Sequence, residues 1–151
     1  MNRVFFLLSI FAIGLGIMTV LTILFWLTYP YKPLVFNDSV FPIKNKIVRQ
    51  GGTLTYVSDY CKNTNLSAVI TRTFTNGLVF IVPAVTSYRP VGCQVINVVV
   101  SIPVELPPGK YFLQNLYSYQ VNPLRTVVVA HNTEEFEVVE ADPDSIGTDA
   151  Q

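Results

Sequence analysis

A long apolar segment near the start of the chain differs from everything that follows it. Residues 4–27 carry no charged side chain, and the clearly polar ones among them are Ser9, Thr19 and Thr22. A helix of this length reaches roughly 36 Å, enough to cross a hydrocarbon core of about 30 Å. The pattern predicts a transmembrane helix over 4–27, between a tail at 1–3 and a linker at 28–33.

A cleaved signal peptide is the alternative interpretation of this segment, and it would make the rest of the chain a secreted domain. The apolar region of such a signal is normally about 7 to 15 residues long and precedes a site of small residues. This run is longer, and residues 28–33 contain no such site. Trp26, Tyr29 and Tyr31 lie where aromatic rings favour the headgroup level. We therefore expect an uncleaved anchor.

The orientation of the anchor depends on several weak signals. Arg3 precedes the helix and four cations follow it by residue 49, so the positive-inside rule alone favours a cytoplasmic domain. That rule is weak for large domains, which translocate largely regardless of charge. A three-residue tail is too short to hold a function, and a cysteine pair suits an oxidising compartment. We expect the N-terminus in the cytoplasm and the domain in the periplasm, lumen or extracellular space.

Small residues share one face of the predicted helix. Ser9, Ala12, Gly16 and Thr19 recur at spacings of three and four, and Ala12 and Gly16 form a small-xxx-small pair. Such a stripe lets two helix backbones approach closely. Small residues are also common in spanning helices, so the stripe is either a packing face for a second helix or ordinary composition.

Alternation with a period of two replaces the apolar run after residue 33. Leu54, Tyr56 and Tyr60 fall on one face of their segment, and the residues between them fall on the other. This is the pattern of a half-buried strand. The dipeptide Asn76-Gly77 between two such segments predicts a hairpin turn. The sequence thus predicts an all-β domain over 34–140, an antiparallel sandwich of seven to nine strands. The expected strands are 34–36, 43–48, 53–60, 66–75, 78–85, 95–104, 111–121, 125–130 and 135–139.

For two of these segments the sequence also predicts the position of the strand in its sheet. Pro83 interrupts 78–85, and its missing N–H suits an edge or bulge position. Residues 95–104 are nearly continuously apolar, so we expect a central strand there.

A short motif resembles the immunoglobulin-like domains. The segment LPPGKYFL at 106–113 is similar to the L-x-x-G-x-Y-x-L pattern that opens their sixth strand, and TEEFEV at 133–138 resembles their last strand. The resemblance implies a tyrosine corner at Tyr111, whose hydroxyl would bond back to nearby backbone. The one tryptophan lies in the anchor, and Cys93 precedes the expected strand at 95–104, which is the fifth when 34–36 and 43–48 are counted as one broken strand. Antibody domains instead have a tryptophan on the third strand and a disulfide between the second and sixth strands. Small membrane-anchored immunoglobulin-like proteins of bacteria and phages are the nearer comparison.

The chain has two cysteines, Cys61 and Cys93, each next to a predicted strand. In an oxidising compartment such a pair is more often bonded than free, so we expect a disulfide. Two buried, separately packed cysteines are the alternative. The pair lacks the C-x-x-C spacing of a redox site.

Catalytic motifs are missing from the sequence. It contains no G-x-S-x-G, P-loop or H-E-x-x-H pattern. Its single histidine, His131, has no ligand pattern around it, so we expect an ordinary strand-end residue, no metal and no cofactor. Asp38, Asp59 and Glu105 are the acids before residue 134, and a glycan-hydrolase dyad among them is the enzyme alternative. We expect a protein that is not an enzyme.

The formal net charge of zero conceals a division along the chain. Residues 32–133 carry nine Lys or Arg against three acids, a net of +6, whereas residues 134–151 carry seven acids. A disordered acidic tail over 141–151 is the simplest interpretation. The alternative is a tail that covers a basic face, and that face could also lie on anionic headgroups.

These observations favour a single-pass membrane protein that presents its domain to another protein, or to a second copy, for binding or structural assembly. Exposed loops are the candidate contacts, with Tyr88 and Arg89 in one and Asn122 and Arg125 in another, because Tyr and Arg are enriched at interfaces. We identify no small-molecule substrate and expect no nucleic acid on that side of a membrane. Two sequons, at Asn37 and Asn65, would accept glycans only in a eukaryotic secretory pathway.

Overall fold

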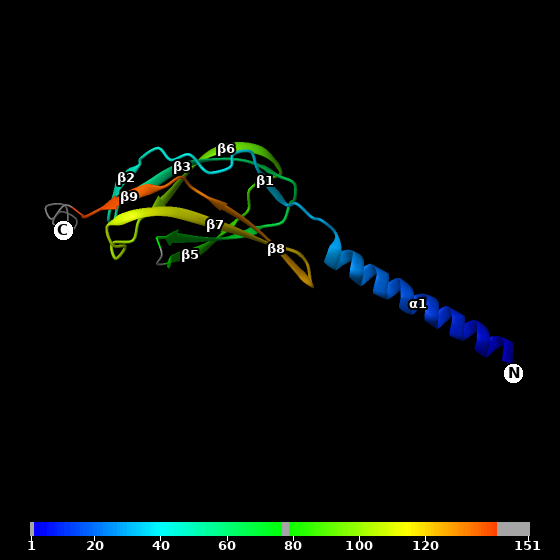
Figure 1. The fold of residues 1–151 in the computed structure, drawn as a ribbon. Helices are drawn as coiled ribbons and strands as arrows, with labels where there is room; N and C mark the ends of the chain where they lie inside the picture. The colour runs from blue at the N-terminus through cyan, green and yellow to red at the C-terminus, as the bar shows by residue number, and fades with distance from the viewer. Residues whose placement is uncertain (1, 77–78, 142–151) are drawn as a thin grey trace, which may run out of the picture.

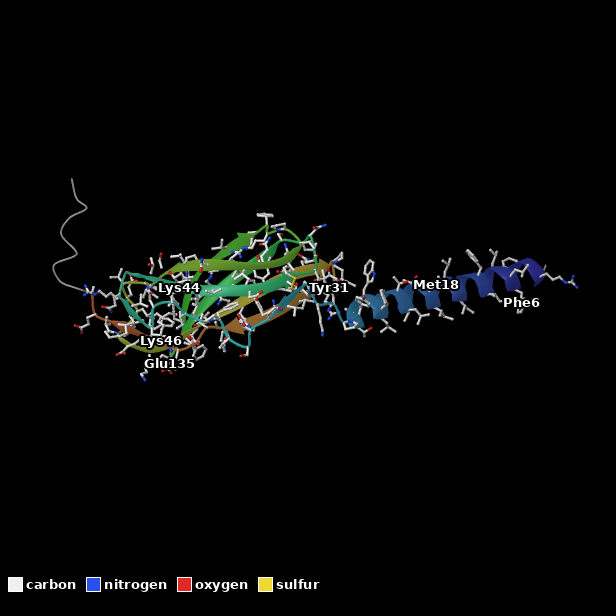
Figure 2. The ribbon with its side chains drawn as sticks, turned by 90° about the horizontal axis from the view of Figure 1, so that it is seen from above. Phe6, Met18, Tyr31, Lys44, Lys46 and Glu135 are labelled. Atoms are coloured by element: carbon white, nitrogen blue, oxygen red, sulfur yellow. A yellow bond between two sulfur atoms is a disulfide. The ribbon has the colours of Figure 1, made fainter. Side chains whose placement is uncertain are left out.

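The computed structural model describes residues 2–76 and 79–141, which form one long helix and a β domain (Figure 1). Helix α1 spans Asn2–Thr28 and projects away from the domain, with side chains such as Phe6 and Met18 pointing outward along its length (Figure 2). Within it, Phe5–Thr28 has a mean hydropathy of 2.5 and none of its residues is buried by the rest of the chain. The helix is therefore long and apolar enough to span a membrane.

Polar side chains of α1 make hydrogen bonds to the helix itself. The hydroxyls of Ser9, Thr19 and Thr22 each donate to the carbonyl oxygen four residues earlier, at 3.0, 2.9 and 2.8 Å. A hydroxyl bonded in this way does not need water, which lowers the cost of placing it in hydrocarbon.

The domain consists of two sheets. The described strands are β1 (Leu34–Phe36), β2 (Ile47–Arg49), β3 (Thr53–Lys62), β4 (Ala68–Thr75), β5 (Val79–Ser87), β6 (Gly92–Ser101), β7 (Gly109–Asn122), β8 (Arg125–Asn132) and β9 (Phe136–Val139). One sheet has the order β1-β3-β6, and the other has the order β2-β9-β7-β4-β5 with β8 paired to β7. The prediction of a β-rich domain after an apolar helix is confirmed.

One pairing differs from the antiparallel sheet that the sequence predicts. β2 and β9 run parallel, with Val48 opposite Val138. The chain passes from β1 in the three-stranded sheet to β2 at the edge of the other sheet. The expected strand at 43–48 is reduced to β2 and an isolated bridge between Ile43 and Tyr56. Pro42, directly before this stretch, cannot donate to a ladder, which limits pairing at its start.

The two sheets enclose a core of large side chains. Leu54, Tyr56, Phe74 and Leu113 are completely buried, and Phe136 is nearly so. Leu54 and Tyr56 occupy the alternate positions that the sequence pattern assigned to one face of residues 53–60. A second cluster, with Leu34, Tyr60, Ile70 and Tyr119 among its members, fills the end of the domain near the helix.

Two strand expectations have different outcomes. β5 is an edge strand, and its pairing with β4 shifts register where Pro83 and Ala84 lie opposite Thr71, as expected for Pro83. The expectation of a central strand at 95–104 is wrong, because β6 pairs with β3 alone at the edge of its sheet. Its outward residues Val95 and Val99 are exposed, so an apolar run does not by itself indicate burial on both faces.

Candidate functional site

The two candidate binding residues in the loop after β5 differ in their exposure. Tyr88 is 81% exposed, whereas Arg89 turns back over β3. The guanidinium of Arg89 lies 5.6 Å from the centre of the Tyr60 ring, and its NH1 donates to the Tyr60 hydroxyl at 3.2 Å. Arg89 therefore belongs to the interior of the domain as much as to its surface.

Arg89 lines a cavity between the sheets that also receives Lys62 and Arg72. Lys62, at the end of β3, is only 3% exposed and its ammonium donates to the carbonyl oxygen of Arg89. Arg72 enters from β4, and its Nε donates to Oδ1 of Asn115 at 3.2 Å. Among the residues that line the cavity in the described part of the chain, there is no aspartate or glutamate. We call Lys62, Arg72 and Arg89 the cation cluster.

Phenol groups surround the cation cluster. Tyr60, Tyr117 and Tyr119 line the same cavity, and the hydroxyl of Tyr56 donates to Oδ1 of Asn115 at 2.9 Å. Burial raises the pKa of Tyr119 to about 12, with the neighbouring Tyr60 acting in the same direction. Burial also raises the pKa of Tyr117, although Arg72 and Arg89 oppose the shift. Tyr117 and Tyr119 therefore stay protonated at neutral pH and do not supply the missing negative charge.

Desolvation lowers the pKa of a basic group, whereas it raises that of a phenol. Burial lowers the pKa of Lys62, because the charged ammonium loses water in the interior. Asn115, which is completely buried, accepts from both Tyr56 and Arg72 through Oδ1, and within the described residues its Nδ2 has no hydrogen-bond acceptor. The cavity is thus rich in hydrogen-bond donors and poor in acceptors.

The loop that carries the candidate binding residues Asn122 and Arg125 contacts the anchor. It is the turn between β7 and β8, and Nδ2 of Asn122 donates to the carbonyl oxygen of Trp26 at 3.1 Å. The guanidinium of Arg125 donates to the carbonyl oxygen of Tyr29. The last carbonyls of a helix lack partners within it and carry partial negative charge, so the Asn122 donor suits the Trp26 carbonyl, whereas Tyr29 lies just after the end of α1. The hairpin therefore joins the domain to the helix.

The small-residue stripe of α1 lies apart from the β domain. Ser9, Ala12, Gly16 and Thr19 are all exposed, and a shallow groove beside Gly16 is lined by Ile13, Ile17, Val20 and Leu21. A Cβ added at Gly16 would meet no atom within 4 Å. The described part of the chain thus offers this stripe nothing to pack against.

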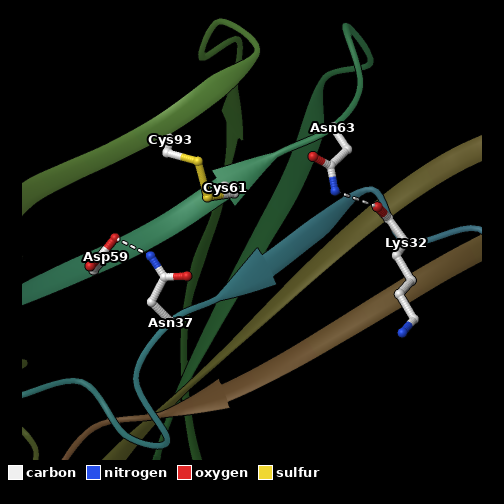
Figure 3. Close-up of a disulfide and its surroundings, with 6 residues drawn as sticks. All are labelled: Lys32, Asn37, Asp59, Cys61, Asn63 and Cys93. Carbon is white, nitrogen blue, oxygen red and sulfur yellow. Dashed lines mark hydrogen bonds between the residues drawn. A yellow bond between two sulfur atoms is a disulfide. The ribbon is translucent and has the colours of Figure 1, made fainter.

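A disulfide joins Cys61 of β3 to Cys93 of β6, which are directly opposite one another in the antiparallel pair (Figure 3). Cys93 lies inside β6 and does not precede the strand as the sequence suggested. The bond therefore crosslinks two neighbours within one sheet. Close by, Nδ2 of Asn37 donates to Oδ1 of Asp59 at 2.7 Å, and Nδ2 of Asn63 donates to the carbonyl oxygen of Lys32 at 3.2 Å.

Tyr111 and the β4–β5 turn are the remaining structural candidates. The hydroxyl of Tyr111 donates to the carbonyl oxygen of Pro107 at 2.9 Å, at the start of β7. β4 and β5 pair as neighbours up to Thr75 and Val79, which places a connection at the expected turn. Asn76 ends the described segment there, and Gly77 lies outside the described residues, as does the acidic tail beyond residue 141.

His131 is packed between aromatic rings. Its ring centre lies 4.3 Å from that of Phe36 and 4.2 Å from that of Phe41. Burial lowers the pKa of His131, although the charge of Asp38 opposes the shift. Within the described residues, no group of three or more His, Cys, Asp or Glu is placed to hold a metal ion.

One outer face of the domain lacks charge over most of its area. It is formed by the outward residues of β4 and by the outward residues beside them on β5, β7 and β8. Along β4 and β7 it extends from the pair Thr75–Phe112 to the pair Val69–Ser118. Ile81 is 71% exposed on it, Val79 63%, Val128 55% and Val69 44%. We call this the uncharged face. Charged side chains such as Lys44, Lys46 and Glu135 gather instead at the end of the domain away from the helix (Figure 2).

Sequence reasoning missed the cation cluster, although part of its signal was present. Lys62 continues the alternation that places Tyr56 and Tyr60 inside, so its inward direction could be read from β3. The inward turn of Arg89 depends on a loop conformation, and Arg72 reaches Asn115 across a sheet pairing. Neither contact has a local signal in the sequence.

Comparisons with known proteins add little. No protein-family model matches the chain, and no curated protein matches it. A solved structure with similarity is that of Pseudomonas fluorescens alkylpurine DNA glycosylase AlkC bound to DNA containing an abasic site analog. The match has a TM-score of 0.38 and 12% identity, and it covers 70% of this chain but 30% of the glycosylase chain. This likeness is too low to support an argument about fold or function.

Proposed function

We propose that the chain is a single-pass membrane protein that presents an immunoglobulin-like domain for protein binding or assembly, without catalysis. The observation that carries the proposal is the uncharged face, with Ile81 and Val79 well exposed at its edge strand. The exposed apolar side chains on this face lie among uncharged polar ones such as Thr73 and Gln114, and apolar patches rimmed by polar residues mark interaction sites. Copies or partners that are anchored in the same bilayer would meet side by side.

The membrane anchor is supported by exposure as well as by composition. A buried core helix would pack its apolar side chains against the domain, whereas those of Phe5–Thr28 are exposed. The junction also favours an uncleaved segment, because Asn122 and Arg125 bond to Trp26 and Tyr29. The disulfide supports placing the domain on the oxidising side of the membrane, with the N-terminus in the cytoplasm.

The strand order supports the immunoglobulin-like assignment. The neighbours β9, β7, β4 and β5 follow the order G, F, C and C′ of variable-type domains, and the pair β3–β6 corresponds to B and E. The Tyr111 hydrogen bond to Pro107 resembles the tyrosine corner at the start of strand F. The bond between Cys61 and Cys93 departs from that pattern, because it lies within one sheet and does not cross between the two.

Site-specific photocrosslinking in the native membrane tests the proposed function. We would place a photoreactive amino acid at Ile81 or Val128 on the uncharged face, and at Glu105 as the matched control at the charged end. Protein adducts are expected from the first two positions, and their mass separates a second copy from another partner. Equal yields at Glu105, or no adducts at Ile81 and Val128, would contradict a binding role for this face.

A topology experiment tests the anchor separately. The full-length chain should stay in the membrane fraction after a carbonate wash, and protease added outside should digest the β domain. Intact mass would reveal cleavage near residue 30. Protection of the domain in sealed cells would reverse the orientation, and a chain lacking residues 4–27 would identify a secreted domain.

A further inference from the structure

The cation cluster presents an imbalance of charge that the described residues do not correct. Lys62 is almost completely buried, and Arg72 and Arg89 are half-buried beside it in the same cavity. Their hydrogen-bond partners are the neutral oxygens of Arg89, Asn115 and Tyr60, respectively. Charges removed from water are normally paired with an opposite charge, because desolvation is otherwise costly.

Carboxylates of the described chain are placed elsewhere. Asp59 bonds to Asn37 beside the disulfide, and Glu135 pairs with Lys110 at 3.6 Å at the other end of the domain. Burial holds Tyr117 and Tyr119 protonated by raising their pKa, so they can donate hydrogen bonds but do not bring negative charge. A negative group in the cavity must therefore come from outside the described chain.

The shape of the cavity limits which anion can enter. Its enclosed part has a volume of about 20 Å³, which is room for roughly one water-sized species. The walls on either side are apolar, with Leu34 and Ile70 among them, so little space is left for an organic group. A single small ion suits this space better than a phosphate or a bulky carboxylate.

We propose that the cavity formed by Lys62, Arg72 and Arg89 between the two sheets binds one small inorganic anion of the size of chloride. The ion would be held by guanidinium and ammonium N–H groups and by a phenol of the surrounding tyrosines. It would offset the like charges that β3, β4 and the loop after β5 bring together. This site is independent of the uncharged face and of the proposed binding function.

Anion-dependent thermal stability of the full-length chain in neutral detergent micelles tests the site. Sodium chloride would replace sodium gluconate at constant ionic strength, and unfolding would be followed by the circular dichroism of the sheets. The midpoint should rise with the logarithm of the chloride concentration, by about 5 °C at ten times the dissociation constant. Bromide should act similarly. Equal midpoints in chloride and gluconate would overturn the proposal.

Variants separate specific binding from general screening. Arg89→Gln removes a cation in a loop and should abolish the chloride-specific rise of the midpoint, whereas Lys110→Gln removes the same charge at the far end and should retain it. A response that survives Arg89→Gln would overturn the site. Acetate stabilising more than chloride would overturn the size argument in favour of a carboxylate site. If Arg89→Gln fails to fold, broadening of the ³⁵Cl resonance by the wild-type chain decides, and its absence overturns the proposal.

Discussion

The side-chain amide of Asn122 donates to the carbonyl oxygen of Trp26 at 3.1 Å, across a separation of 96 residues. With the neighbouring bond from Arg125 to Tyr29, it fixes the tip of the β7–β8 hairpin against the end of α1. The linker after Thr28 contains Pro30 and Pro33, which narrow its backbone freedom. The domain is therefore held on its anchor by side chains as well as by the covalent chain.

We predict that the double change Asn122→Ala and Arg125→Ala loosens the domain on its anchor without unfolding it. The two bonds are exposed, so the free energy of unfolding of the domain should stay within about 0.5 kcal/mol of the parent. Spin labels at Met18 and Ser101 would report a broader distance distribution in the variant. Leu124→Ala is the control in the same turn and should not broaden it. An unchanged width in the double variant would mean that the linker alone sets the geometry.

The disulfide leads to a second prediction. Cys61→Ala and Cys93→Ala should each lower the free energy of unfolding by about 3 to 4 kcal/mol, because either change releases the same loop, with a sequence separation of 32. The double variant should cost little more than either single one. Urea unfolding of the full-length chain in micelles provides the measurement. Additive losses would show that the two side chains stabilise the fold through their packing and not through the bond.

Local patterns made much of the fold predictable. The charge-free run gave the position of α1, and alternation identified the inward residues of β3, including Leu54 and Tyr56. Pro83 indicated an edge because it lacks an N–H. Each of these features depends on residues that are neighbours in the sequence: the hydropathy of a run, the alternation along a strand, or the missing N–H of a proline.

The rest could not be predicted because it depends on pairing between distant segments. The valines of β6 have the same composition whether the strand is central or at an edge, and only the sheet order leaves Val95 and Val99 exposed. Asn122 and Arg125 were expected to face a partner, since nothing local shows that the helix end lies beside them. The cation cluster likewise requires three elements to meet, although the alternation of β3 already directed Lys62 inward.

The single histidine allows a clean test of pH dependence. His131 packs against Phe36 and Phe41, and its Nε2 is buried without a hydrogen-bond partner in the described residues. Burial favours the neutral imidazole and lowers the pKa of His131 in the folded state, while Asp38 opposes this only partly. The unfolded chain, with an ordinary histidine pKa of about 6.5, therefore binds a proton more readily than the folded chain.

It follows that the contribution of His131 to stability is complete above about pH 6.5 and is lost as the pH falls through that value toward the lower folded pKa. We expect the free energy of unfolding in micelles to decrease between about pH 7.5 and pH 5. His131→Phe keeps an aromatic ring beside Phe36 and Phe41 and removes the titration, so its stability should depend less on pH over this interval. Because carboxylates ordinarily titrate below about pH 5, the comparison above that value isolates the imidazole. The NMR titration of the His131 ring protons gives the folded pKa directly. A value above 6.5, or the same pH dependence in His131→Phe, would mean that the attraction of Asp38 exceeds the effect of burial.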